Sequence, residues 1–251
     1  MAQQTAGNID DVLEEILDYQ VDGIVLASVA MSSVLAERCD AAGIPVVLFN
    51  RAQQEDRFST VTSDNFAGGK ALAEFLVAGG HRRIGYIAGW EGASTQRDRE
   101  AGFCAGLAEH GHKLFARGVG DFQTETAAKA ARAMFSASEF PDAVFVANDH
   151  MAFAVIEELR GNLGLRVPED VSVVGYDDVQ LSRWSSFDLT TVRQPSGEMV
   201  AETVAALMAQ IEDGETEPRR VKIDGPLVVR GSARRPADWK VHWKECDDER
   251  L

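Results

Sequence analysis

Basic residues are scarce in this sequence. Among 251 residues, 25 lysines and arginines face 40 aspartates and glutamates, which gives a formal net charge of −15. Extended contact with a nucleic-acid backbone needs clustered positive charge, because every phosphate is negative. We therefore do not expect these residues to bind DNA themselves.

Cysteine is scarce as well, and long apolar runs are missing. The three cysteines (Cys39, Cys104 and Cys246) form no CxxC pair, which favours isolated reduced thiols over a disulfide or metal framework. No apolar run approaches the ~18 residues of a membrane helix. The first residues, MAQQTAGNIDD, lack the positive and apolar regions of a signal peptide. With 45% hydrophobic residues, the sequence predicts a globular cytoplasmic protein without membrane contact.

The common catalytic and metal-binding patterns are also missing. The sequence contains no GxSxG, P-loop or HExxH pattern, and its histidines are not spaced as metal ligands, so structural roles are favoured for them. The two adjacent aspartates, Asp177 and Asp178, raise the possibility of a glycosidase, which uses a pair of carboxylates. Neighbouring residues at a strand end need not flank one glycosidic bond, however. We expect no catalytic residue, metal or cofactor; a carbohydrate hydrolase is the weakest function class considered.

A regular alternation of short apolar runs and helix-period segments is what the sequence does contain. Continuous apolar runs indicate strands covered on both faces, and repeated βα units imply parallel sheets with right-handed crossovers. A single sheet would be unusually long, so two doubly wound lobes are predicted. The expected strands are 23–27, 45–49, 84–88, 143–147, 171–175, 189–193 and 226–230; the expected helices are 9–17, 34–42, 67–78 (capped by Asp64 or Asn65), 98–109, 125–135, one from 149, and 196–211.

Polar residues follow three of these strands in the second half of the chain. If the strands are parallel neighbours, the polar residues share one crevice, where ligands of open α/β sheets bind. Arginine donors with Asp and Asn acceptors suit a polyhydroxylated ligand, and aromatic rings could pack on a sugar ring or base. The polar residues are Arg97, Arg99, Asn148, Asp149, Asp177 and Asp178; the aromatic ones are Trp90, Phe122 and Trp184.

Several of these residues have structural alternatives. Asp149 directly precedes a helix and is favoured as its N-cap over a ligand contact. Asp178 could equally cap or brace a turn, and Arg97 is favoured as a solvated surface residue. Trp184 could equally be simple packing. The residues alone leave open whether Asp177 or Asp178 contacts a ligand.

A set of segments in a fixed order has a recognisable pattern. They are DGIVLAS at 22–28, IPVVLFNR at 44–51, SDNFAGGKALAEFLVAGGHRRIGYIAG at 63–89, RDREAGF at 97–103, DAVFVANDHMAFAVIEEL at 142–159, VPEDVSVVGYDDV at 167–179, LTTVRQP at 189–195 and LVVRGSAR at 227–234. Together they resemble the lactose-repressor (LacI/GalR) family of bacterial transcription regulators. The resemblance covers about residues 8–234, and the order of ANDxMA, VGYDD and LTTVRQP is its most specific feature.

The resemblance implies an α/β fold of the periplasmic-binding-protein-like type I, with two Rossmann-like lobes that contain parallel sheets. The family's N-terminal helix-turn-helix, hinge helix and first βα unit have no counterpart in this sequence, so an incomplete N-terminal lobe is expected. Three crossovers are expected near Gly80, Gln194 and Lys222. The implied domains are an N-terminal lobe of residues 1–80 plus 195–222, a C-terminal lobe of 81–194 plus 223–236, and a tail of 237–251.

The resemblance also implies a set of ligand-binding residues. Arg99, Asn148 and Asp177 match the family's main effector-binding positions, which favours Asp177 over Asp178. Phe122 matches an aromatic residue that packs on the ligand. Asp64 and Asn50 match pocket-facing positions of the first lobe, and Gln194 matches the hinge. With the aromatic candidate Trp184 added, the predicted set is Arg99, Asn148, Asp177, Phe122, Asp64, Asn50, Gln194 and Trp184.

The implied function is effector binding and dimerisation in a LacI-type regulator. A small ligand, in the first place a sugar, would bind between the lobes and modulate DNA binding. The expected partners are this effector and a second copy of the chain, with DNA contacted only through the missing N-terminal domain. A periplasmic sugar-binding protein of a transport system shares the fold and is the alternative. The missing signal peptide and the pairing of VGYDD with LTTVRQP argue against it.

Overall fold

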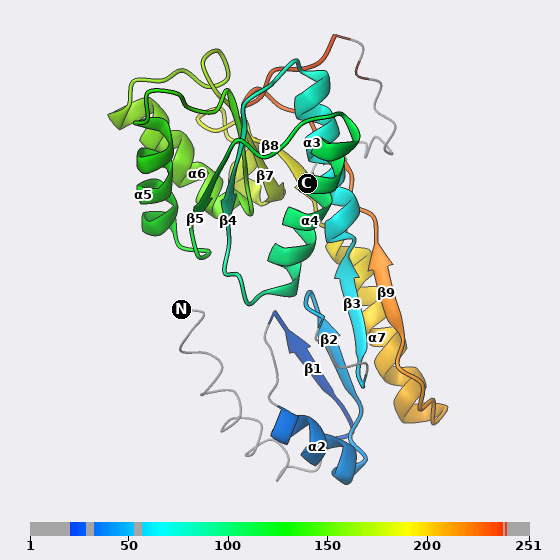
Figure 1. Ribbon diagram of the computed structural model, residues 1–251. Coiled ribbons are helices and arrows are strands. Elements are labelled where there is room, and N and C mark those ends of the chain that lie inside the picture. The colour runs from blue at the N-terminus through cyan, green and yellow to red at the C-terminus, as the bar shows by residue number, and fades with distance from the viewer. Residues whose placement is uncertain (1–20, 29–32, 53–56, 238, 240–251) are drawn as a thin grey trace. The chain divides into compact units, whose positions relative to one another are not determined.

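The computed structural model describes residues 21–28, 33–52, 57–237 and 239. The expected helix at 9–17 lies outside these residues. The chain forms two compact units: residues 1–63 with 195–223, and residues 64–194 with 224–251. Each unit is an open sheet covered by helices, as Figure 1 shows.

The first unit contains a parallel four-stranded sheet in the order β1-β2-β3-β9. Alternate side chains of β2 point to opposite faces. Leu48 packs with Cys39 and Phe58 on the side of α2, whereas Val47 packs with Met199 and Ala206 of α7. The elements are β1 (Ile24–Ala27), α2 (Ser33–Ala42), β2 (Val46–Phe49), β3 (Ser59–Ser63), α7 (Ser196–Glu212) and β9 (Arg220–Ile223).

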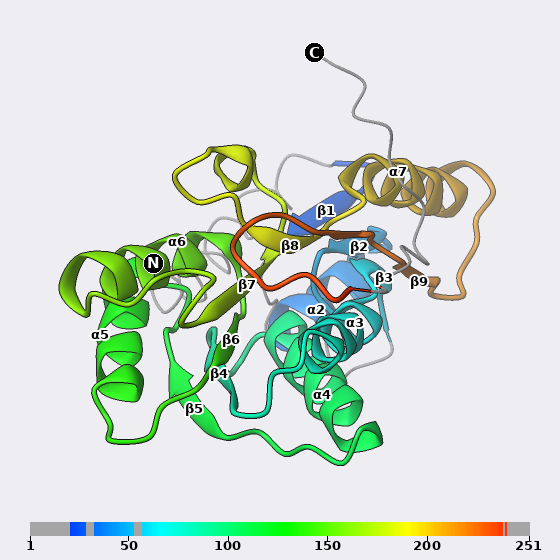
Figure 2. The ribbon, with the colours of Figure 1, turned by 90° about the horizontal axis from the view of Figure 1, so that it is seen from above.

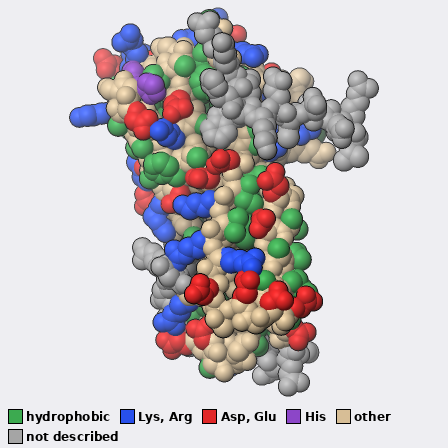
Figure 3. Space-filling view, turned by 90° about the vertical axis from the view of Figure 1, so that its right-hand side faces the viewer, with side chains coloured by type: hydrophobic (Ala, Val, Ile, Leu, Met, Phe, Trp, Pro, Cys, Tyr) green, Lys and Arg blue, Asp and Glu red, His purple; other side chains and the backbone are tan. Residues whose placement is uncertain are grey.

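Part of the first unit's apolar surface remains exposed. Strand β1 is at the end of the described sheet, and its side chains alternate between buried and exposed, with Val25 45% exposed. Helix α7 carries Val200, Val204, Met208 and Ile211, which are 37–54% exposed. Figure 3 shows exposed hydrophobic side chains beside acidic ones on one face of the protein. The helix therefore has an apolar face that the described residues do not cover.

The second unit contains a six-stranded sheet in the order β10-β8-β7-β6-β4-β5. All its strand pairs are parallel except β10 with β8. Helices α3 and α4 cover one face and α5 and α6 the other (Figure 2). The elements are α3 (Asn65–Ala78), β4 (Ile84–Ala88), α4 (Ser94–Glu109), β5 (Ala116–Val119), α5 (Thr124–Phe135), β6 (Ala143–Val146), α6 (Asp149–Glu157), the π-helical turn η1 (Glu158–Asn162), β7 (Ser172–Asp177), the 3-10 turn η2 (Gln180–Arg183), β8 (Thr190–Arg193) and β10 (Leu227–Val228).

An aromatic cluster forms the centre of this unit's core. The rings of Tyr86 on β4, Phe103 on α4 and Phe145 on β6 have centroids 5.0–5.9 Å apart. All three side chains are fully buried. Each burial of this size contributes roughly 1.5–3 kcal/mol, so the cluster fixes α4 against the sheet.

Close packing of α3 on α4 sets the first boundary between the units. A Cβ atom on Gly102 of α4 would lie 2.0 Å from the Phe66 carbonyl oxygen, so only glycine permits this approach. Because α3 packs against α4, it belongs to the second unit. The first boundary therefore falls at residues 63–64 and differs from the crossover expected near Gly80. The other two boundaries fall at 194–195 and 223–224.

Three observed strands were not predicted from the sequence: β3, β5 and β9. Their sequences, STVTS, ARGV and RVKI, contain few consecutive apolar residues, and each is a strand because a neighbour supplies its hydrogen bonds.

In the expected tail, Trp239 packs edge-on against Phe75 with centroids 5.1 Å apart; the remaining tail residues, except Ala237, lie outside the described residues. Among the described residues, no helix is long and apolar enough to span a membrane.

Candidate ligand-binding site

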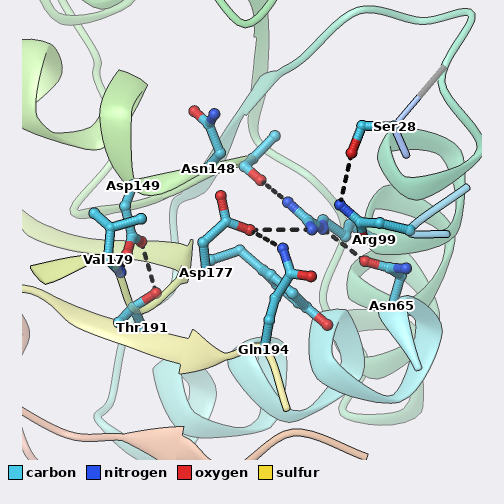
Figure 4. A network of polar contacts seen from close by, with 12 residues as sticks. Ser28, Asn65, Arg99, Asn148, Asp149, Asp177, Val179, Thr191 and Gln194 are labelled. Carbon is cyan, nitrogen blue, oxygen red and sulfur yellow. Dashed lines mark hydrogen bonds and ion pairs between the residues drawn. The ribbon is translucent and has the colours of Figure 1, made fainter. Parts of the chain in front are cut away.

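Arg99 is at the centre of a polar network in the second unit (Figure 4). Its side chain is 3% exposed. The Nε group donates to Asn65 Oδ1 at 2.8 Å, and Nη1 donates to the Ala147 carbonyl at 2.6 Å. The guanidinium also lies over the Tyr176 ring, 3.7 Å from its centroid, in cation–π geometry. Arg99 is therefore held by contacts with α3, with the residue after β6 and with β7.

Asp177 connects Arg99 to Gln194. Its Oδ1 atom accepts from Arg99 Nη2 at 3.2 Å and from Gln194 Nε2 at 2.6 Å. Burial raises the pKa of this carboxyl, while the Arg99 charge and the Gln194 hydrogen bond act in the opposite direction. The structure thus joins three of the predicted residues, Arg99, Asp177 and Gln194, by direct contacts.

Two polar groups beside this network have no protein partner among the described residues. Both bonds to Asp177 use Oδ1, so Oδ2 accepts no hydrogen bond, and the side chain is 20% exposed. Asn148 uses Oδ1 to accept from the Met151 N–H at 3.0 Å, which leaves its Nδ2 donor without a partner. Figure 4 shows Asn148 beside the Asp177–Arg99 pair. An unpaired acceptor next to an unpaired donor is suited to the hydroxyl groups of a ligand.

The adjacent carboxylate of Asp178 has a different role. It is completely buried and accepts from Arg193 Nε at 2.5 Å and from Arg230 Nη2 at 2.6 Å. Asp177 and Asp178 both have left-handed φ angles, 127° and 56°, so the backbone turns the two carboxylates apart. Of the two alternatives for Asp178, the geometry shows the structural one: it braces the turn against β8 and Arg230.

Asp149 is not the N-cap of α6, and this prediction was wrong. The cap is Asn148, one residue earlier. Asp149 is fully buried and accepts from Thr191 Oγ1, Ser182 Oγ and the Val179 N–H at 2.6, 2.7 and 3.0 Å. Burial raises its pKa to about 6, and the Asp177 charge adds to this effect.

Helix α3 begins with two polar residues that have different roles. Asp64 caps the helix, as predicted, because its Oδ1 accepts from the Ala67 N–H at 2.9 Å. Asn65, and not Asp64, contacts Arg99. Asn65 was named only as a possible cap, and the Ala147 carbonyl is a backbone group that no side-chain pattern identifies. Asp64 as a ligand contact stays a prediction.

The two aromatic candidates have different environments. Phe122 is partly buried against the core of the unit and has a left-handed φ of 55°. Trp184 follows η2 and is 59% exposed, so simple packing does not account for it. Arg97 is an exposed residue that donates to the Glu91 and Gly92 carbonyls, as the surface alternative predicted. Ligand contacts of Phe122 and Trp184 stay predictions.

Asn50 belongs to the first unit, where it follows β2. It has a left-handed φ of 59°, and its Nδ2 donates to Ser28 Oγ at 3.3 Å. Its buried Oδ1 atom has no partner among the described residues. Both residues follow the carboxyl ends of parallel strands, which is where ligands of such sheets bind. A ligand role for Asn50 stays a prediction.

The first unit also has an open cavity of ≈ 310 Å³ that the sequence did not indicate. It lies at the other ends of the strands, beside the start of β2, so it is separate from Asn50. Its lining residues include Asp40, Ile44, Arg57, Phe58 and Gln210. Within the described residues, no cluster of three or more His, Cys, Asp or Glu side chains could hold a metal ion.

Comparison with known proteins agrees with this fold. The family model described as "Periplasmic binding protein-like domain" matches residues 73–233. The regulator CelR of Thermobifida fusca is 37% identical over 219 residues, which cover 84% of this chain and 63% of that protein. The repressor PurR of Photobacterium profundum is 30% identical over 236 residues, 92% of this chain and 70% of that protein.

Solved structures of LacI-family regulators have a similar fold. A CelR–cellobiose complex superposes with a TM-score of 0.82 at 33% identity, covering 89% of this chain and 69% of that one. A LacI regulator from a Rhodococcus species gives 0.80 at 27%, covering 89% and 82%.

The chain belongs to the LacI family of transcriptional regulators. This confirms the predicted α/β fold of the periplasmic-binding-protein-like type. The related proteins are named as transcriptional regulators, not as transport proteins or enzymes, so the regulator is favoured over the transport alternative. The chain spans 63% of the length of the CelR relative.

Proposed function

We propose that this LacI-family chain binds a small polyhydroxylated effector, in the first place a sugar, at the Arg99–Asp177 network and thereby modulates DNA binding. The observation that carries the proposal is a pair of groups, Asp177 Oδ2 and Asn148 Nδ2, that have no partner among the described residues and lie beside a buried arginine. Vicinal hydroxyls donate to the first group and accept from the second. The cellobiose bound in the related CelR structure supports a sugar.

The network is well placed along the chain to transmit binding. Gln194 is the last residue before the chain leaves the second unit, and Asn65 is the second residue after the chain enters it. Both side chains are bonded within the network. A ligand that changes the contacts of Arg99 or Asp177 therefore acts directly on the residues beside two crossings. Different affinity for two arrangements of those crossings would supply the coupling free energy that regulation requires.

The DNA contact and the assembly complete the proposal. The net charge of −15 disfavours DNA binding by these residues, so we assign that contact to a further domain of the regulator. The relatives named HTH-type regulators support this assignment. We also propose that two copies of the chain associate, which the exposed apolar side chains of β1 and α7 support.

Thermal unfolding with and without ligand tests the proposal. Cellobiose, ribose and adenosine would each be added to the chain at millimolar concentration. At least one sugar should raise Tm, because a ligand that binds only the folded state stabilises it by roughly 2.7 kcal/mol at a hundredfold excess over Kd.

Two arginines of α4 provide the matched variants. Arg99→Ala should abolish the rise in Tm, whereas Arg97→Ala removes an exposed arginine two residues away and should leave it intact. No rise with any compound in the wild-type chain would contradict effector binding at this site. An equal loss in both variants would contradict the role of Arg99.

A further inference from the structure

Asp149 binds three groups from three consecutive segments that follow Asp177 along the chain. Its Oδ2 atom accepts from the Val179 N–H, in the turn after β7, and from Ser182 Oγ in η2. Its Oδ1 atom accepts from Thr191 Oγ1 of β8. The side chain is completely buried, and all three donors are neutral. One carboxylate thus ties the segment from β7 to β8 to the first turn of α6, as Figure 4 shows for Val179 and Thr191.

The segment held in this way begins with a strained turn. Asp177 and Asp178 have φ angles of 127° and 56°, conformations that L residues adopt rarely and that persist only when the surroundings enforce them. The turn brings Asp177 toward Arg99 and Gln194. The Val179 N–H bonded by Asp149 follows the strained pair directly. Asp149 therefore acts at the point where the turn would otherwise relax.

Gly175 provides an independent indication that the carboxylate is specifically accommodated. A Cβ atom at this position would lie 2.3 Å from Asp149 Oδ1 and 3.0 Å from Leu189 Cδ2. Glycine is therefore required on β7 if the carboxylate is to reach Thr191. The glycine of VGYDD and the aspartate of ANDHMA are two halves of one packing arrangement.

We propose that Asp149 is the positioning residue of this site: it holds the 177–179 turn so that Asp177 faces Arg99 and Gln194, and it does not itself touch the ligand. The expected effect of Asp149 on ligand binding rests on the proposed function. Its effect on the turn is independent of any ligand. The two effects can therefore be measured separately.

Amide hydrogen exchange of the full chain measures the turn. The Val179 amide is bonded to Asp149, and the Gln194 amide donates to the Asp177 carbonyl at 3.3 Å, so the two amides report on both ends of the arrangement. In Asp149→Ala both should exchange about tenfold faster or more than in the wild type, relative to amides of β6, because the part-buried Val179 N–H loses its acceptor and the turn that carries the Asp177 carbonyl is released. Unchanged exchange at Val179 would overturn the proposal.

Asp149→Asn is the conservative variant. Its amide oxygen can still accept from Val179 and Ser182, and its NH2 group can donate to the Thr191 hydroxyl, which also accepts. Exchange at Val179 and Gln194 should stay within about threefold of the wild type. Exchange as fast as in Asp149→Ala would show that the charge, not the positioning, is what matters, and would overturn the proposal.

Two further variants keep the test decisive if Asp149→Ala fails to fold. Gly175→Ala removes no polar group but displaces the Asp149 carboxylate, so it should also accelerate exchange at Val179. Asp142→Ala is the matched control, since Asp142 also accepts from backbone N–H groups of this unit, those of Arg82 and Arg83. It should leave Val179 unaffected. If Gly175→Ala leaves Val179 unchanged, or if Asp142→Ala has the same effect, the proposal is wrong.

Cellobiose affinity, measured by calorimetry, tests the consequence for binding. Asp149→Ala should weaken binding about tenfold or more, and Asp149→Asn should stay within about threefold of the wild type. Faster exchange without weaker binding would overturn the positioning role. If the wild-type chain binds no cellobiose, that result counts against the proposed sugar, while the exchange data still decide whether Asp149 holds the turn.

Discussion

The two sheets of this protein differ in how completely they are covered. In the second unit, β4, β6 and β7 are buried on both faces almost along their whole length. In the first unit, β1 alternates between buried and exposed residues, and α7 exposes four large hydrophobic side chains. Burial of apolar area is the main stabilising term in folding. The second unit therefore has the more stable core, and it also contains the rigid polar network.

The difference suggests a division of roles within the chain. A buried arginine keeps a fixed geometry only when the surrounding packing leaves no alternative, and the second unit meets this condition around Arg99. The first unit has apolar surface available for contacts outside the described residues. Four measurements test this difference between the two units.

The largest effect is expected from truncating one core side chain in each unit. Phe145→Ala should lower the free energy of unfolding of the second unit by about 3–5 kcal/mol, since the ring is fully buried among aromatic neighbours. Leu48→Ala should cost the first unit about 2–3 kcal/mol, because the partly exposed sheet of this unit can relax around the space that the shorter side chain leaves. Native-state hydrogen exchange measures each unit separately. A larger cost for Leu48→Ala would reverse the comparison.

A second effect concerns buried and exposed ion pairs. Asp178→Ala should destabilise the second unit by about 3 kcal/mol, because it leaves Arg193 and Arg230 without their buried carboxylate. Asp170→Ala is the control: Asp170 pairs with Arg166, whose side chain is 70% exposed, and such pairs contribute about 0–1 kcal/mol. Denaturant unfolding gives both values. Equal losses of stability in the two variants would show that the ion pairs of Asp178 do not brace the turn.

The third effect is a pH dependence caused by Asp149. Its pKa rises from an ordinary 3.8 to about 6 in the folded protein, so the folded state binds the proton more tightly than the unfolded state. Stability from this group is present below pH ~4 and is lost as pH rises through about 6, a change of at most about 3 kcal/mol. The stability of Asp149→Asn relative to the wild type should therefore increase as pH rises from ~4.5 to ~7.5. A difference that is constant over this range would contradict the buried charged carboxylate.

The smallest effect is expected on the outer face of α7. Val204 is 54% exposed, so Val204→Ser should change stability by less than about 0.5 kcal/mol. Met199, on the same helix, is 1% exposed, and Met199→Ala should cost about 2 kcal/mol or more. Chemical denaturation compares the two. If both variants lose the same stability, the outer face of α7 is covered in the folded protein, and the two sheets are covered to a similar extent.

Much of the fold could be predicted from the sequence because burial leaves a pattern. The continuous apolar runs at 84–88, 143–147 and 171–175 predicted β4, β6 and β7, and Asp64 was correctly expected to cap α3. Strands β3, β5 and β9 carry no such pattern. They are strands because neighbouring strands supply hydrogen bonds, which is a long-range effect.

The candidate site shows the same limit at the level of single residues. The apolar pattern of the chain indicates that polar residues follow three buried strands, which made Arg99, Asn148 and Asp177 candidates. This pattern alone could not divide the tasks within the adjacent pairs, Asn148 with Asp149 and Asp177 with Asp178; the family resemblance favoured Asp177 over Asp178. The tertiary structure shows what each of these side chains binds. Neighbouring side chains point in different directions, and the partners of Asp149 and Asp178 are 30–42 and 15–52 positions away along the chain.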